Sequence, residues 1–275
     1  MLKKLVFVFL LVVIGIGVLF FFKKPSETIP IGAYDAVSTV EVHVQMMNIE
    51  VAPSPDDQLH VVLDGKQGEE EQFSIDHQAA QLIIMEKPAK GKWTDYIQIG
   101  AQPTIQLQVP PSANTSISLT NQDGNSQLKG LDIDSLYVKS STGKVALRET
   151  TVAKIEVRST DGNIAIHKST MEKGILSTKS GNVTVKESSG NALDIQSWDG
   201  QIKLTEATEQ AETRLKSKTG DIHVSYSTAP NSLKLTTSGE NVKIALPNYD
   251  QQTGQVGEGA NQLAIETKDG VIEVK

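Results

Sequence analysis

Two stretches of the chain, Val138-Lys-Ser-Ser-Thr-Gly-Lys-Val-Ala-Leu147 and Val157-Arg-Ser-Thr-Asp-Gly-Asn-Ile-Ala-Ile166, repeat one pattern nineteen residues apart. In each stretch an apolar residue stands five positions before the glycine, and two more stand two and four positions after it. Apolar residues that alternate with polar ones have the period of a β-strand. The pattern therefore predicts a strand on each side of a glycine corner.

The same frame recurs through the C-terminal part of the chain. Its glycines are nineteen residues apart over the first five repeats, and the later spacings are twenty, nineteen and a longer step with an insertion: Gly124, Gly143, Gly162, Gly181, Gly200, Gly220, Gly239 and Gly270. One such repeat cannot bury its apolar edge alone, so neighbouring repeats must stack. We therefore expect an all-β protein in which residues 116–275 form a parallel β-solenoid of about eight 19-residue coils, roughly 40 Å long at about 4.8 Å per coil.

Antiparallel hairpins are the alternative architecture, because Asp-Gly between alternating strands is also typical of hairpins. The constant period and the lack of any helical pattern favour the solenoid. We expect the glycine to supply a positive φ at a tight corner. In the seventh repeat, Leu235, Val242 and Ile244 keep the register only if the glycine has slipped by one position.

A polar residue stands three positions before each of these glycines, counted in the seventh repeat from the unslipped glycine position, and its parity places it on the inward face. We expect these side chains to form a ladder in which each bonds a neighbour or a free backbone group at the bend. The ladder would consist of Asn121, Ser140, Ser159, Thr178, Ser197, Ser217, Thr237 and Thr267.

The N-terminus contains an uninterrupted apolar segment. Leu5 to Phe22 is eighteen residues without a charge, or about 27 Å of helix, close to the thickness of a hydrocarbon core. The segment ends in bulky residues and is followed by Lys23, where a cleaved signal would have a small-residue cleavage site, which favours an uncleaved anchor. We expect a cytoplasmic stub at 1–4, a transmembrane anchor at 5–22, a linker at 23–32, and a single-pass cell-membrane protein whose C-terminal domain is extracytoplasmic.

Residues 33–115 are rich in strand patterns but lack the period, so we expect an irregular β segment that caps the solenoid. Thr39 to Val51 resembles a degenerate coil without its glycine. Further strands are expected at Leu59–Leu63, Gln81–Met85, Tyr96–Ile99 and Thr104–Val109. Residues 247–259 form an insertion, which we expect to be flexible, before the last coil.

Composition excludes several classes of function. The formal net charge of -7 leaves no basic stripe for nucleic acid. The chain has no cysteine, so disulfides, thiolate metal sites, cysteine nucleophiles and a lipoprotein anchor are excluded. The sequence shows no phosphate-binding glycine loop, nucleophile elbow or dinucleotide fingerprint.

No residue stands out as catalytic, cofactor-binding or metal-binding. Asp123, Asp161 and Asp199 align on one face, but on alternate coils, roughly 9 to 10 Å apart, which suits turn residues better than a carboxylate pair. Trp198 points outward or lies at a corner, where we favour a wedge against a loop over a platform for a sugar or partner. The five histidines have no ligand spacing and are expected to be surface residues: His43, His60, His77, His167 and His223.

An N-terminal apolar segment, a β segment that ends in Ile105-Gln-Leu-Gln-Val-Pro110, and repeated Ser-x-x-Gly-x-Ile/Val-x-Ile/Val units together resemble the bacterial LiaG-type proteins with an adhesin-type β-strand-repeat domain. The resemblance implies a membrane-attached, extracytoplasmic protein of a Gram-positive bacterium, linked in some members to the cell-envelope stress response. It transfers no functional residue, because the family has no catalytic motif.

Three functions are compatible with the sequence. The first is a non-enzymatic adhesin-like or scaffolding module, whose solenoid face binds a cell-wall polymer, a membrane protein or another copy. The second is a carbohydrate-active β-helix enzyme that acts on a cell-wall polysaccharide. The third is a regulator of a two-component system.

Overall fold

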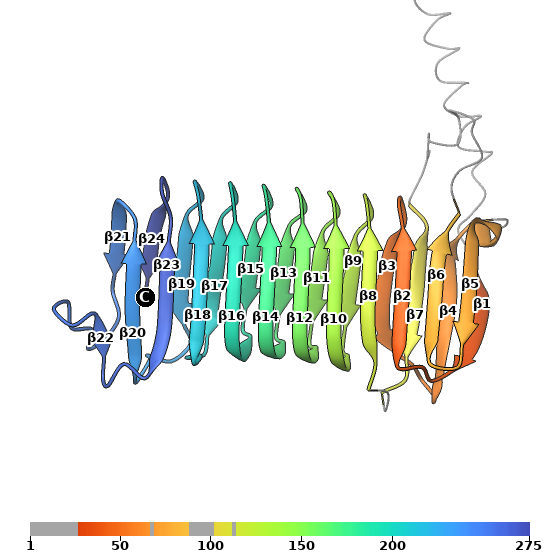
Figure 1. Cartoon of the computed structure of the whole chain (residues 1–275), viewed down its shortest axis with the longest axis horizontal. Helices are drawn as coiled ribbons and strands as arrows, with labels where there is room; N and C mark the ends of the chain where they lie inside the picture. Colours follow the sequence, from red (N-terminus) through yellow and green to blue (C-terminus); the bar gives the residue numbers. More distant parts are fainter. Residues whose placement is uncertain (1–26, 67–68, 88–101, 112–113) are drawn as a thin grey trace, which may run out of the picture.

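The computed structural model describes residues 27–66, 69–87, 102–111 and 114–275, and in these the chain is a stack of two-stranded coils (Figure 1). A representative coil begins with the nine-residue strand β12 (Thr151–Ser159). It turns at a corner that contains Gly162 and continues as the four-residue strand β13 (Ile164–His167). A second corner then leads into the next long strand, β14 (Thr170–Thr178).

Successive coils pair in parallel and in register. Val157 of β12 lies beside Leu176 of β14, and Ile164 of β13 lies beside Val183 of β15 (Val183–Lys186). The chain advances by one repeat per coil, so identical positions stack above one another. The parallel solenoid is confirmed, and the hairpin alternative is wrong.

The long strands of the coils form most of sheet B. Its order is β22-β20-β23-β18-β16-β14-β12-β10-β8-β2-β6-β5. The strands not yet given are β22 (Gln255–Val256), β20 (Leu233–Ser238), β23 (Asn261–Glu266), β18 (Glu212–Ser217), β16 (Ser189–Ser197), β10 (Asp132–Ser140), β8 (Ser116–Asn121), β2 (Thr39–Val44), β6 (Gln81–Glu86) and β5 (Phe73–Gln78).

The short strands form most of sheet A, in the order β1-β4-β7-β3-β9-β11-β13-β15-β17-β19-β24-β21. The strands not yet given are β1 (Glu27–Asp35), β4 (Gln58–Gly65), β7 (Thr104–Val109), β3 (Asn48–Pro53), β9 (Ser126–Lys129), β11 (Val145–Arg148), β17 (Ile202–Ala207), β19 (Ile222–Tyr226), β24 (Val271–Val274) and β21 (Asn241–Ile244). The helical content of the described residues is one 3-10 turn, η1 (Glu69–Gln72), so the all-β prediction is confirmed.

The core lies between the two sheets and runs along the rod as one cluster of buried apolar residues. Each regular coil contributes the residues that the alternation predicts, such as Val157, Ile164 and Ile166, all buried. Because each coil buries its apolar residues between the sheets and also against the coils above and below, stability is shared between neighbours.

The eight glycine-containing coils are present, but their order in space differs from their order in sequence. β23 pairs with β18 on one side and β20 on the other, and β24 lies between β19 and β21. The last coil of the chain is therefore inserted before the seventh, as Figure 1 shows at its blue end. Residues 247–259, expected as a flexible insertion, contain a hydrogen-bonded turn and β22, which pairs antiparallel with β20.

The seventh coil also corrects the predicted register. Thr237 pairs with Ile265, not with the polar ladder, while Val242 and Ile244 pair with Ile272 and Val274. The corner of this coil thus contains fewer residues than the corner of the last coil. The predicted displacement of the glycine by one position is wrong. β21 of this coil is the edge strand of sheet A, which leaves Val242 37% exposed.

The segment at 33–115 is more regular than expected. β2 and β3 form a coil that stacks in parallel on β8 and β9, which confirms the degenerate coil at Thr39–Val51. β6 and β7 stack in parallel on β2 and β3, so coils are present on both sides of residue 116. Antiparallel pairing of β1 with β4 and β5 with β6 closes this end of the rod.

The strands predicted at Leu59–Leu63, Gln81–Met85 and Thr104–Val109 correspond to β4, β6 and β7. The linker predicted at 23–32 is wrong from residue 27 onward, because β1 begins at Glu27 and pairs with β4. β1 is an edge strand whose pairing shifts between Pro30 and Gly32, and an edge is where a sheet tolerates proline.

The predicted stub, the anchor at 5–22 and the strand at Tyr96–Ile99 lie outside the described residues. Among the residues that are described, no helix is both long enough and apolar enough to cross a membrane.

Candidate functional site

The glycine corner positions the candidate site, and its geometry explains the repeated glycine. A Cβ added at Gly181 would lie 2.1 Å from the carbonyl oxygen of Gly162 in the preceding coil. The distance to the neighbouring backbone oxygen is between 1.7 and 2.2 Å for Gly124, Gly143, Gly162, Gly181, Gly200, Gly220 and Gly270. None of these glycines has a positive φ, so the predicted reason for them was wrong. They are required because the coils approach too closely for a side chain.

The polar ladder beside these glycines bonds backbone groups rather than its own members. The Thr178 hydroxyl accepts from the Gly181 N–H at 3.1 Å and donates to the Gly162 carbonyl at 3.3 Å. Ser197 repeats this between Gly200 and Gly181, and so do Ser217 and Thr267 on the next two coils. Each hydroxyl thus links its own corner to the corner of the preceding coil. The prediction that these side chains bond free backbone groups at the bend is confirmed for these residues.

Just outside this ladder, the position two residues before each glycine forms a row along one edge of the rod. We call it the outer row: Gln122, Ser141, Thr160, Lys179, Trp198, Lys218 and Lys268. The Trp198 N–H donates to the Lys179 carbonyl at 3.1 Å, the Lys218 N–H to the Trp198 carbonyl at 3.1 Å, and the Lys268 N–H to the Lys218 carbonyl at 3.0 Å. These backbone bonds place three lysines and one tryptophan on four consecutive coils.

The second half of the outer row lines a groove of about 670 Å³. Its charged lining residues are Lys179, Lys216, Lys218, Glu266 and Lys268. Lys216 pairs with Glu266 at 2.9 Å. The lining is therefore positive overall, so the inference from the net charge of -7 that the chain has no basic stripe is wrong for this edge.

Lys179, Lys218 and Lys268 are exposed, and none of them has a carboxylate within ion-pair distance in the described part of the chain. The nearby Asp199 accepts a hydrogen bond from the Thr219 hydroxyl and is not part of the groove lining. The three ammonium groups are thus available to an external anion.

Trp198 is 54% exposed, and the ammonium nitrogen of Lys218 lies 4.4 Å from its ring centroid. This is cation–π geometry, which holds the lysine beside the ring. The preferred prediction of a wedge packed against a loop is wrong, because the ring faces the groove and solvent. An exposed aromatic face beside cations is suited to stacking on a sugar ring or another flat group.

The second corner carries a different pattern, which the sequence interpretation missed. Four residues spaced nineteen apart adopt a left-handed backbone with φ of 49 to 53°: Glu149, Lys168, Glu187 and Glu206. The sequence does mark this left-handed position once, with a glycine: Gly130 precedes Glu149 by nineteen residues and has φ 68°. The residues that follow form a second buried hydroxyl row, in which Ser169 Oγ accepts from the Thr150 N–H and Ser188 Oγ from the Ser169 N–H.

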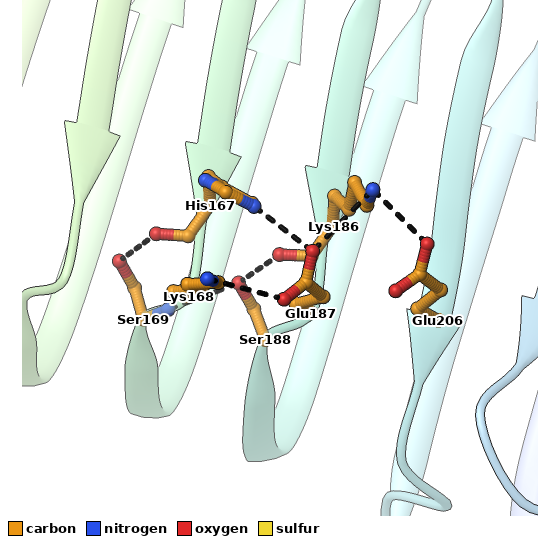
Figure 2. A network of polar contacts seen from close by, with 7 residues as sticks. All are labelled: His167, Lys168, Ser169, Lys186, Glu187, Ser188 and Glu206. Atoms are coloured by element: carbon orange, nitrogen blue, oxygen red, sulfur yellow. Dashed lines mark hydrogen bonds and ion pairs between the residues drawn. The ribbon is translucent and has the colours of Figure 1, made fainter.

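The side chains at this corner form the network in Figure 2. Glu187 contacts His167 at 3.1 Å, Lys186 at 3.3 Å and Lys168 at 3.7 Å, and Lys186 also pairs with Glu206 at 3.0 Å. The hydrogen bond from His167 lowers the pKa of Glu187, with help from both lysines. Glu206, and then Glu187, raise the pKa of Lys186. Because these charged groups are paired with one another, they stabilise the corner, and few of them are available to bind a ligand.

The remaining sequence candidates do not converge. Asp123 and Asp199 accept hydrogen bonds from Thr142 and Thr219 of the next coil, as expected for turn residues. Four histidines each contact one carboxylate, and His77 lies against the Tyr34 ring. In the described ranges, no group of three or more His, Asp or Glu side chains is arranged to hold a metal ion.

Residues 37–275 match the sequence profile of the family described as Toastrack DUF4097. The chain belongs to the Toastrack family. Two solved structures of similar fold are candidate adhesins. The one from Bacteroides fragilis is 16% identical with a TM-score of 0.57, and the one from Parabacteroides merdae is 12% identical with a TM-score of 0.58. In both cases the match covers 92% of this chain and 97% of the other.

A third structure of similar fold, from Parabacteroides distasonis, is a candidate lipid-binding protein. It is 14% identical with a TM-score of 0.57, and the match covers 92% of this chain and 98% of that one. At these identities the likeness shows a shared fold alone. No curated protein matches the sequence.

Proposed function

We propose that this Toastrack protein is a non-enzymatic, adhesin-like binding module of the cell envelope. The observation that carries the proposal is the groove at the outer row, where Trp198 is half exposed between Lys179 and Lys218. A rigid rod with one aromatic, cationic groove can hold an extended partner without a deep pocket. The names of the fold relatives, two candidate adhesins, agree with this role.

A carbohydrate-active enzyme is the less favoured function. Glycoside hydrolysis commonly uses two carboxylates placed on either side of the bond that is cleaved. Among the described residues that line the groove, Glu266 is the one carboxylate, and Lys216 neutralises it. The groove therefore has binding groups but lacks a second carboxylate.

The proposal includes attachment to the membrane through residues 5–22, with the rod outside the cell. The support is the length of this apolar segment and the lysines on both sides of it. Protease added to intact cells tests the orientation: digestion of the rod is expected, and a rod that stays intact until the cells are lysed contradicts it.

Co-sedimentation of the full-length chain, in a non-ionic detergent, with isolated bacterial cell walls tests the binding function. We expect the wild type to sediment with the walls and Trp198→Ala to sediment less. The control is Tyr137→Ala, which removes another exposed aromatic side chain, 37% exposed, outside the groove lining. A wild-type chain that stays in the supernatant at all wall concentrations contradicts the proposal.

A further inference from the structure

We propose that the groove binds an anionic polysaccharide, laid along the rod axis across the four coils that carry Lys179, Trp198, Lys218 and Lys268. This inference rests on the proposed binding function and adds the chemical class of its ligand. The recognised chemistry is a sugar ring that stacks on Trp198 and acidic groups that pair with the lysines. Those groups are carboxylates in one class of glycan and phosphodiesters in another.

The spacing of the cations supports a polymer rather than a small anion. Strands in a sheet are about 4.8 Å apart, so the cations of Lys179 and Lys268 belong to backbone positions roughly 14 Å apart. Their backbones are joined in one continuous line of hydrogen bonds through Trp198 and Lys218. One small anion would contact all three ammonium groups only if the long side chains converged on it, whereas a chain with an acid group on successive sugars can contact each of them where it lies.

The tryptophan supports a glycan rather than any polyanion. Trp198 lies between two lysines of the row, so a ligand that contacts both of them must pass over its ring. The coil spacing is close to the length of one sugar unit in an extended polysaccharide. A sugar ring can therefore stack on the indole while its neighbours along the chain contact the flanking lysines.

The charge balance of the molecule gives selectivity. The groove lining contains four lysines and one glutamate, whereas the whole chain has a net charge of -7. A flexible polyanion is therefore attracted more strongly to this edge than to a surface of average charge on this chain. Attraction that depends on three exposed ammonium groups must weaken as salt is added.

The decisive experiment measures binding of the full-length chain, in non-ionic detergent, to immobilised polygalacturonate and phosphomannan, with neutral dextran and single-stranded DNA as comparisons. The test variants are Trp198→Ala and the triple variant Lys179→Gln, Lys218→Gln, Lys268→Gln. The matched control is Lys154→Gln, Lys173→Gln, Lys234→Gln, which removes the same charge from exposed lysines outside the groove lining.

We expect the chain to bind at least one of the two acidic glycans. The glycan that binds more strongly shows whether the recognised acid group is a carboxylate or a phosphodiester. The triple variant should lose at least tenfold in affinity and most of the salt dependence, in line with about one unit of salt slope per lysine. Trp198→Ala should lose about tenfold, as expected for one stacked ring. The control variant should stay within about twofold, a margin expected for charges far from the ligand.

Equal binding to dextran overturns the inference, and so does an equal loss in the control variant. Binding to DNA as strong as to the glycans, and unaffected by Trp198→Ala, shows simple charge attraction and also overturns it. If the wild type sediments with cell walls but binds neither acidic glycan, the ligand class is wrong while the binding function stands. If it does not sediment at all, the proposed function itself fails.

Discussion

Replacing Gly181 with alanine is the sharpest test of how the coils are held together. The new Cβ would lie 2.1 Å from the Gly162 carbonyl oxygen, 2.6 Å from the carbon of that carbonyl and 3.0 Å from the Thr178 hydroxyl oxygen. Two of these atoms are backbone atoms of Gly162, in a corner held between the paired strands β12 and β13, so they cannot rotate away. The two coils must therefore separate locally.

The expected cost combines two effects. Overpacking at a site that cannot relax destabilises by about 1–3 kcal/mol. Separation also weakens the Thr178 bonds to the Gly181 N–H and the Gly162 carbonyl, for about 1 kcal/mol each. We expect Gly181→Ala to lower the free energy of unfolding by about 3–5 kcal/mol, or roughly 6–20 °C in Tm for a domain of this size.

Replacement of Gly181 with asparagine distinguishes close approach of the coils from a requirement for positive φ. Asparagine adopts a left-handed backbone more readily than other residues with a side chain, so it would be tolerated if φ were the reason for the glycine. We expect Gly181→Asn to be at least as destabilising as Gly181→Ala. At Gly130, where φ is 68° and an added Cβ meets Pro53 at 3.5 Å, asparagine should cost less than about 1 kcal/mol. Urea unfolding followed by circular dichroism measures both, and a near-neutral Gly181→Asn refutes the reasoning.

Four further outcomes are expected. Thr178→Val should cost about 1–3 kcal/mol in urea unfolding because it leaves two buried backbone groups without their partner, whereas Thr178→Ser keeps the hydroxyl and should cost less. Glu187→Gln should reduce stability at pH 7, and this loss should shrink as the pH falls below the usual glutamate pKa: the pKa of Glu187 is lowered in the fold, so its contribution is present above the usual glutamate pKa and is lost as the pH falls through the folded one. A difference between these two proteins that stays constant down to the lowest pH at which both are folded contradicts this assignment. Glu149→Gly should unfold at the same or higher urea concentration, with a gain of up to about 1 kcal/mol, because φ of 53° strains a residue that has a side chain. Deletion of residues 261–275 should expose residues 228–260 to limited proteolysis, because the deleted coil lies between them and the rest of the rod; resistance to the protease would show that β20 and β21 dock without it.

The regular coils were predictable because their sequence encodes them in several consistent ways. Alternation places Val157 and Ile164 inside, and the hydroxyl and glycine recur at fixed offsets. The reason for the glycine was not predictable from the same pattern, since a positive φ and a close approach both select that residue. Only the position of the Gly162 oxygen relative to Gly181 distinguishes them.

The candidate groove could not be predicted because it depends on the order of the coils in space. Lys218 and Lys268 are fifty residues apart in sequence, yet their backbones are hydrogen-bonded. The sequence repeat contains no signal that the last coil precedes the seventh. The second corner was missed for a different reason, since glutamate and lysine stand where a left-handed backbone would normally be marked by glycine or asparagine.

The coil architecture explains why the outer row is the place where the proposed binding chemistry can vary. Inside the row, the close contact at Gly181 requires glycine, and the bonds of Thr178 restrict the ladder position to a small hydrogen-bonding side chain. One position further along, between the ladder residue and the glycine, the side chain points away from the core and any residue fits. In this chain the row changes along the rod from neutral residues at Thr160 and before to Lys179, Trp198 and the later lysines. A fold that fixes its inner positions and frees one outer row can change the chemistry of that row without changing how the coils stack. The residues of the outer row should therefore vary among Toastrack proteins more than the glycines beside them.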